Sequence, residues 1–272
     1  MSLPFLKFAA GILMIAVSGT AQARELRVCA DPNNMPFSNR SENGFENRIA
    51  ELLAKDLKAH LTYVWQRMGR GFVREYLNQS KCDLLIGIPA NYGPVLTTSP
   101  YYRSTYVFVS RRDQRLNLVS FDSPALHESG LKIGVQVLDE QYTPPGEALA
   151  RRGLQSEIVG FNTSGEGADS IIRSVLKHQI NAAVVWGPLA GYFAQKYRSS
   201  LQLAAVEPEV DPPGLPFTFA ISMGVRKGNI ALRDELEKFL IERRAEISGI
   251  LNQYGVPQLP LSPATAIQRA AN

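Results

Sequence analysis

Apolar residues follow two alternating spacings along the chain. Short continuous apolar runs at residues 26–30 and 84–88 are typical of buried strands. After the first run, Phe45, Ile49 and Leu53 recur at the spacing of one helical face. A strand, helix and strand order that repeats in this way predicts a mostly parallel sheet with helices on both faces.

The same order recurs in the second half, with strands expected at residues 132–137 and 182–186. Two β-prone segments, residues 101–110 and 217–225, bracket this second unit. A chain of 272 residues is also near the size at which one core becomes two. We therefore expect an α/β protein of two lobes, each a mixed, mostly parallel sheet flanked by helices, joined by two hinge strands.

This arrangement sets the expected boundaries. Lobe 1 comprises residues 24–109 plus 220–272, and lobe 2 comprises residues 110–219. The apolar stripe from Leu232 to Tyr254 predicts one long amphipathic helix that packs back on lobe 1. Two lobes on a two-strand hinge form a cleft that can close on a ligand.

The N-terminus has the three parts of a secretory signal. Lys7 is followed by an apolar run at residues 8–17 and by small residues that end in Ala21-Gln22-Ala23. The run is much shorter than the roughly 20 residues that span a bilayer, so an anchor is the weaker interpretation. We expect a signal peptide over residues 1–23, cleavage after Ala23 and a periplasmic protein with no membrane insertion.

Composition and charge limit the class of protein and the kind of partner. With 45% hydrophobic and 20% charged residues the chain is of ordinary globular type. Its 29 basic and 25 acidic residues are spread without long runs of one sign, so a nucleic-acid partner gains no support. The mild basic excess suggests a partner surface around Arg67, Arg70 and Arg74.

Export makes Cys29 and Cys82 candidates for a disulfide. Cys29 lies inside one expected strand and Cys82 opens another, so parallel pairing would separate them by several residues. Both alternatives stay open at this point, a disulfide or two buried free thiols.

Conventional catalytic motifs are absent from the sequence. It has no G-x-S-x-G, no H-E-x-x-H, no P-loop and no complete G-x-G-x-x-G. His60, His127 and His178 are scattered without metal-ligand spacing. We expect neither a metal site nor catalytic residues.

Ligands of open α/β sheets bind beyond the carboxyl ends of the strands. The residues expected there are polar or aromatic, and they come from loops of both lobes. The expected cleft residues are Asp31, Asn34, Phe37, Trp65, Arg67, Asn91, Tyr92, Tyr101, Tyr102, Asp139 and Trp186.

Several segments resemble the type II periplasmic solute-binding proteins that deliver polar amino acids to ABC importers. The segments are LRVCADPNNMPF (26–37), CDLLIG (82–87), SPYY (99–102) and KIGVQ (132–136). This resemblance covers essentially the whole mature chain. It implies the two-lobed periplasmic-binding-protein fold of type II.

The chain departs from amino-acid receptors at two charged positions. Those receptors usually carry an arginine about ten residues before the first Tyr of PYY, and Asn91 stands there. They also carry an aspartate after the A-V-V strand, where this chain runs into Trp186. Losing both charge-assisted contacts makes an amino acid an unexpected ligand.

A narrower resemblance accounts for the departures. Residues 29–39, 44–54, 70–90 and 95–109 resemble the solute-binding-like J proteins encoded with periplasmic methanol dehydrogenases. That resemblance implies a non-enzymatic accessory protein of methanol oxidation that assists assembly or activation of a PQQ-dependent methanol dehydrogenase. PQQ then belongs to the partner dehydrogenase, and this chain binds no cofactor.

Two alternatives remain. In the first, the chain is a substrate-binding receptor of an ABC importer for a small, weakly charged solute. The aromatic rim of the expected cleft supports this alternative, because aromatic rings can stack on an uncharged ligand. The remaining alternative is an enzyme on the same scaffold, as in periplasmic dehydratases of cyclohexadienyl acids. Acids such as Asp31, Glu46, Asp139 and Glu140 would then supply a general acid or base, although nothing in the sequence pairs them.

Overall fold

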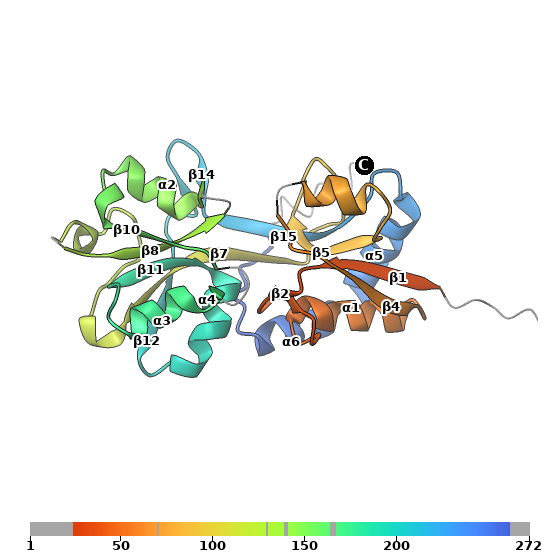
Figure 1. The fold of residues 1–272 in the computed structure, drawn as a ribbon, viewed down its shortest axis with the longest axis horizontal. Helices are drawn as coiled ribbons and strands as arrows, with labels where there is room; N and C mark the ends of the chain where they lie inside the picture. Colours follow the sequence, from red (N-terminus) through yellow and green to blue (C-terminus); the bar gives the residue numbers. More distant parts are fainter. Residues whose placement is uncertain (1–23, 70, 129, 139–140, 164–166, 262–272) are drawn as a thin grey trace, which may run out of the picture.

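The computed structural model describes residues 24–69, 71–128, 130–138, 141–163 and 167–261. The expected signal peptide, Arg70 and Asp139 lie outside the described residues. The chain forms two lobes side by side, each a sheet with helices on both faces (Figure 1). The α/β fold of two lobes joined by two strands is thus confirmed.

Lobe 1 is built around the strands β1, β4 and β5. The strand β1 lies between β4 and β5 and is parallel to both, as the alternating pattern predicts. The helices α1, α5 and α6 cover one face, and a short π-helix covers the other. The elements are β1 (Glu25–Ala30), β2 (Asn33–Asn34), β3 (Ser38–Asn39), α1 (Phe45–Asp56), β4 (His60–Trp65), the π-helix (Val73–Leu77), β5 (Leu84–Pro89), β6 (Leu96–Thr97), α5 (Ile230–Glu242) and α6 (Arg244–Gln253).

Lobe 2 repeats the plan with β8 parallel to both β10 and β11. The helix α2 packs on one face of this sheet, and α3 and α4 pack on the other. The elements are β8 (Ile133–Leu138), β9 (Gln141–Tyr142), α2 (Pro144–Arg151), β10 (Ile158–Phe161), α3 (Ser170–Leu176), β11 (Ala182–Trp186), α4 (Gly187–Ala194), β12 (Leu201–Ala205), β13 (Val210–Asp211) and β14 (Leu215–Pro216).

Two antiparallel strands, β7 (Tyr102–Arg111) and β15 (Thr218–Val225), run between the lobes. Tyr102 to Thr105 of β7 pair with β15, whereas the residues from Tyr106 onward pair with β11 and β12. The order β10-β8-β11-β7-β15-β5-β1-β4 is therefore continuous through both lobes. The lobe boundaries at residues 109 and 220 stay a prediction, and the change of pairing partner lies between Thr105 and Tyr106.

The C-terminal part of the chain differs from the single helix that we expected. Two helices, α5 and α6, meet at Arg243, whose φ of −105° and ψ of 18° interrupt the helix. The Arg243 guanidinium donates to the carboxylate of Asp56 at the end of α1, so the break coincides with an anchor on lobe 1. The apolar stripe is nevertheless buried in the core of lobe 1 on both helices.

After α6 the chain turns toward the hinge. The Leu259 amide donates to the Arg103 carbonyl of β7 at 2.8 Å, and the Ser104 hydroxyl donates to the Pro257 carbonyl at 2.6 Å. Gly187 of α4 has no room for a side chain, because a Cβ there would lie 2.5 Å from the Thr105 carbonyl oxygen of β7 and 3.2 Å from Cγ of Pro257 in the segment after α6. The segment after α6 therefore contacts the hinge strand and also packs against α4 of lobe 2.

Cys29 and Cys82 form a disulfide, with their Cα atoms 5.5 Å apart. The expectation that strand pairing separates them is wrong, because β5 begins at Leu84 and Cys82 lies in the bend before it. The Asp83 amide donates to the Arg27 carbonyl, and the Arg27 guanidinium donates to the Asp83 carboxylate. These bonds hold the bend beside β1, within reach of Cys29.

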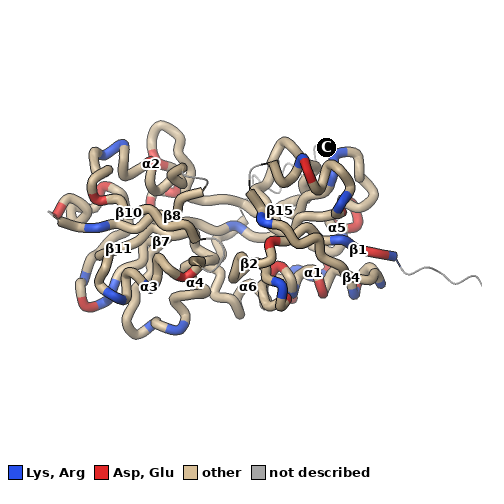
Figure 2. The backbone as a smooth tube through the Cα atoms, in the orientation of Figure 1, with Lys and Arg blue, Asp and Glu red and all other residues tan. Residues whose placement is uncertain are grey.

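Charged residues of both signs are interspersed over both lobes, and most of the central strand segments carry none (Figure 2). This agrees with the absence of a one-sign stretch in the sequence. Within the described residues, no helix combines the length and apolar composition needed to cross a bilayer.

Candidate functional site

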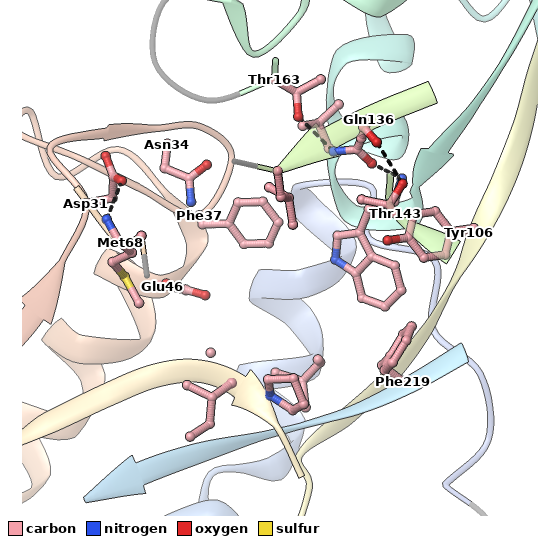
Figure 3. Close-up of a pocket in the computed structure, with 18 of the residues that line it drawn as sticks. Asp31, Asn34, Phe37, Glu46, Met68, Tyr106, Gln136, Thr143, Thr163 and Phe219 are labelled. Carbon is pink, nitrogen blue, oxygen red and sulfur yellow. Dashed lines mark hydrogen bonds between the residues drawn. The ribbon is translucent and has the colours of Figure 1, made fainter. Parts of the chain in front are cut away.

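A cavity of about 560 Å³ lies between the two lobes beside the hinge (Figure 3). Its volume falls in the range of small-molecule sites, roughly 300–1,000 Å³. Lobe 1 contributes the loops after β1 and β4, the start of α1 and the end of β5. Lobe 2 contributes the end of β8 and the starts of α2 and α4, and the hinge contributes side chains of β7 and β15.

Asp31 fixes the lobe 1 wall. Its carboxylate accepts hydrogen bonds from the amides of Asn33 at 2.9 Å and Met68 at 3.0 Å. The Ser38 hydroxyl donates to the Asp31 carbonyl at 2.9 Å. Asp31 therefore joins the loop after β1 to the loop after β4, which brings Asn34, Phe37 and Arg67 to one wall.

Glu46 points into the cavity from the first turn of α1 (Figure 3). A side chain on Gly87 of β5 would overlap its carboxyl oxygen, so the glycine in CDLLIG makes room for this acid. Burial in the lobe 1 wall, together with repulsion from Asp31, raises the pKa of Glu46 to about 8. The carboxyl group is therefore mostly protonated at neutral pH.

Aromatic rings form two sides of the cavity. On the lobe 2 and hinge side, the ring centroid of Trp186 lies 5.3 Å from Tyr106 and 5.8 Å from Phe219. On the lobe 1 side, Phe37 and Tyr102 line the cavity, and both pack against the buried Phe45. Edge-to-face packing of this kind fixes the positions of the rings in the cavity wall.

Gln136 holds the lobe 2 wall together. Its side-chain amide donates to the Thr163 hydroxyl at 2.8 Å, and its side-chain carbonyl accepts from the Trp186 amide at 2.5 Å. The Thr143 hydroxyl donates to the Gln136 backbone carbonyl at 2.8 Å. These bonds connect β8, the start of α2 and the end of β11, which orients Trp186 toward the hinge.

The structure brings most of the expected loop residues together. Those that line the cavity are Asp31, Asn34, Phe37, Arg67, Tyr102 and Trp186.

Four expected residues lie elsewhere. Trp65 stacks on Tyr63, with ring centroids 4.6 Å apart. The Tyr101 hydroxyl donates to the Ile86 carbonyl at 3.2 Å. Asn91 and Tyr92 sit in an exposed turn after β5, where Asn91 has a φ of +60°. Neither therefore takes the place of a ligand-binding arginine in the cavity.

Other lining residues were not among those expected. Glu46 and Gln136 supply polar groups, and Tyr106 and Phe219 supply rings. Tyr106 and Phe219 lie on the hinge strands, where the sequence pattern indicates only burial. The signal for Glu46 is its place in the first turn of the helix that follows the first cleft loop, next to Gly44 and Phe45.

The described ionisable groups of the chain include no candidate metal site. Among the described residues, no group of three or more His, Cys, Asp or Glu side chains is placed to hold a metal ion. Asp31 and Glu46, which nothing pairs in the sequence, do line the same cavity. The wall thus has one carboxylate with two backbone donors and one carboxyl group directed into open space.

Comparison with known proteins gives relatives over nearly the whole chain. Protein MoxJ of Methylorubrum extorquens is 31% identical over 267 residues, which cover 91% of this chain and 86% of MoxJ. The crystal structure of the periplasmic binding protein XoxJ from Methylobacterium extorquens AM1 matches with a TM-score of 0.69 at 35% identity, covering 87% of this chain and all of that one. The structure of MxaJ from Methlophaga aminisulfidivorans MPT matches with a TM-score of 0.73 at 27% identity, covering 86% of this chain and all of that one.

The family model described as bacterial extracellular solute-binding proteins, family 3, matches residues 26–256. This range contains both lobes, the hinge strands and every described residue of the cavity wall. The chain therefore belongs to family 3 of the bacterial extracellular solute-binding proteins, as a relative of the J proteins.

Proposed function

We propose that this chain is a periplasmic, solute-binding-like accessory protein of methanol oxidation that assists assembly or activation of a PQQ-dependent methanol dehydrogenase. The observation that carries the proposal is the full-length similarity to MoxJ, XoxJ and MxaJ. The resemblance of the sequence to J proteins encoded with methanol dehydrogenases supplies the partner. PQQ is the dehydrogenase's cofactor in this proposal.

The geometry of the cleft supports a role other than amino-acid transport. Asn91 lies in an exposed turn and is not among the residues that line the cavity, and Trp186 packs against Tyr106 and Phe219. An ammonium or carboxylate ligand would meet neither of the charged groups that family amino-acid receptors use at these two positions.

The proposal is tested by adding the purified mature chain to the methanol dehydrogenase of the same organism. We expect the two proteins to copurify and the fraction of active, PQQ-loaded dehydrogenase to rise when the chain is present during assembly. A chain denatured by heat serves as the control. Failure to copurify, with the same yield of active enzyme in both samples, would show that the proposal is wrong.

A second candidate is a receptor of an ABC importer for a small solute that is not a typical amino acid. The interlobe cavity, whose walls are held by the hydrogen bonds of Asp31 and Gln136, is the observation that favours it. Deleting the gene would then abolish uptake of the solute while leaving the activity of purified dehydrogenase unchanged. If the chain is instead an accessory protein, deleting the gene would lower the activity of the purified dehydrogenase and leave uptake of the solute unchanged.

A further inference from the structure

Two kinds of group direct negative potential into the interlobe cavity, carboxyl groups and aromatic rings. Asp31 and Glu46 contribute carboxyl groups from lobe 1. Five aromatic side chains line the space, and the face of an aromatic ring carries partial negative charge. Among the described residues that line the cavity, Arg67 is the single basic side chain. This distribution of charge in the cavity wall disfavours an anionic ligand.

The two carboxyl groups differ in what they bind. Asp31 accepts hydrogen bonds from two backbone amides, which keep it in the wall. The described part of the chain supplies no hydrogen bond to the Glu46 carboxyl, which faces the space between the two groups of rings (Figure 3). Glu46 is thus a polar group without a protein partner inside a preformed cavity.

We propose that this cavity binds a small organic cation of the alkylammonium class, with the ammonium group placed between Glu46 and the aromatic rings. An ammonium over ring faces is attracted by the ring quadrupole, and a carboxylate beside it adds the counter-charge. Phe37 and Tyr102 on the lobe 1 side and Trp186 on the lobe 2 side line the same cavity as Glu46. Closure of the lobes on such a ligand desolvates the pair.

The competing ligand classes fit this wall less well. An amino acid would bring its carboxylate into a cavity that already holds Asp31 and Glu46. A bare metal ion would need more oxygen ligands than these two acids supply. An uncharged ligand of the same shape would gain nothing from the charge of Asp31 or from the ring faces. The experiment therefore compares a cation with an uncharged ligand of the same shape.

The test uses choline and its uncharged isostere 3,3-dimethylbutan-1-ol, with tetramethylammonium and ethylammonium as further cations. Calorimetric titration at low salt and pH about 8.5 should give a dissociation constant below about 1 mM for at least one cation, and binding of the alcohol at least tenfold weaker. Glu46→Gln should weaken cation binding at least tenfold and leave the alcohol unaffected. Glu51→Gln, an exposed acid on the same helix, is the matched control and should bind as the wild type does.

A pH series provides a readout that needs no variant. Asp31 acts electrostatically on Glu46, Glu46 acts in turn on Tyr101 and Tyr102, and Arg67 lines the same cavity. Burial raises the pKa of both tyrosines well above the usual value. Glu46 is therefore the group expected to change charge near pH 8. Cation affinity should rise more than tenfold from pH about 6.5 to 8.5, while affinity for the alcohol stays flat.

Three results would overturn the inference. They are an alcohol that binds as tightly as choline, Glu46→Gln protein that binds the cations as the wild type does, and the absence of binding by all three cations at about 10 mM. The inference goes beyond the accessory role, and a failed copurification with the dehydrogenase leaves it untouched. Conversely, the absence of cation binding leaves the accessory role standing.

Discussion

Breaking the disulfide between Cys29 and Cys82 is expected to lower the free energy of unfolding by about 4 kcal/mol. The bond joins residues 53 apart in sequence, and the entropy that such a crosslink removes from the unfolded chain corresponds to about 4 kcal/mol. Both cysteines are nearly inaccessible to water, with exposed fractions of 3% and 1%. After reduction the two thiols stay buried in the folded state, so hydration of the thiols does not offset the lost crosslink.

The measurement is urea unfolding of the mature chain with and without reductant, together with thermal unfolding. The reduced protein should unfold about 10 °C lower. Cys29→Ala and Cys82→Ala are the controls, because each lacks the bond and should be insensitive to reductant. An unfolding midpoint of the wild type that does not shift on verified reduction would contradict the prediction.

Raising the pH from 5 to 8 is expected to destabilise the protein by about 3 kcal/mol through Glu46 alone. The folded pKa of about 8 exceeds the model-peptide value of 4.5, so the folded protein binds more protons than the unfolded chain between these pH values. This contribution favours the folded state at low pH and is lost as the pH rises toward 8.

Glu46→Gln removes the titrating group while keeping the shape of the side chain. Its stability relative to the wild type should rise steadily from pH 5 to 8, by about 1.4 kcal/mol per pH unit in the middle of the range. Glu51→Gln on the exposed side of the same helix should follow the wild type. Parallel stability curves for the wild type and Glu46→Gln would falsify the assignment of this pKa.

The two-lobed fold was predictable from the sequence because apolar residues recur at helical spacing in the helices and form continuous runs in the buried strands. The hinge strands were found as β-prone runs at the correct places, and β7 and β15 start within one residue of the expected positions. The break between α5 and α6 was not predictable, since the apolar stripe continues across Arg243. What ends α5 there is local backbone geometry at a residue that also pairs with Asp56.

The site was only partly predictable, and the reason is orientation. Loop residues after strands, such as Asp31 after β1 and Arg67 after β4, reach the cavity because both loops lie at the carboxyl edge of the sheet. At the end of β4, Trp65 instead turns onto Tyr63. Tyr106 and Phe219 reach the cavity from inside strands, where period and hydropathy indicate burial but do not say whether the residue faces a core or a cleft.

The segment after α6 has a consequence for how the lobes can move relative to each other. Besides β7 and β15, it supplies a third connection at the joint, through the bonds of Pro257 and Leu259 to β7 and the close packing on Gly187. A joint held at two antiparallel strands can bend and twist, whereas a third attachment beside them restricts sliding and sideways rotation. The lobes should therefore open and close about a single axis, and a probe attached at Gln258, between the two residues that bond to β7, would report on that joint.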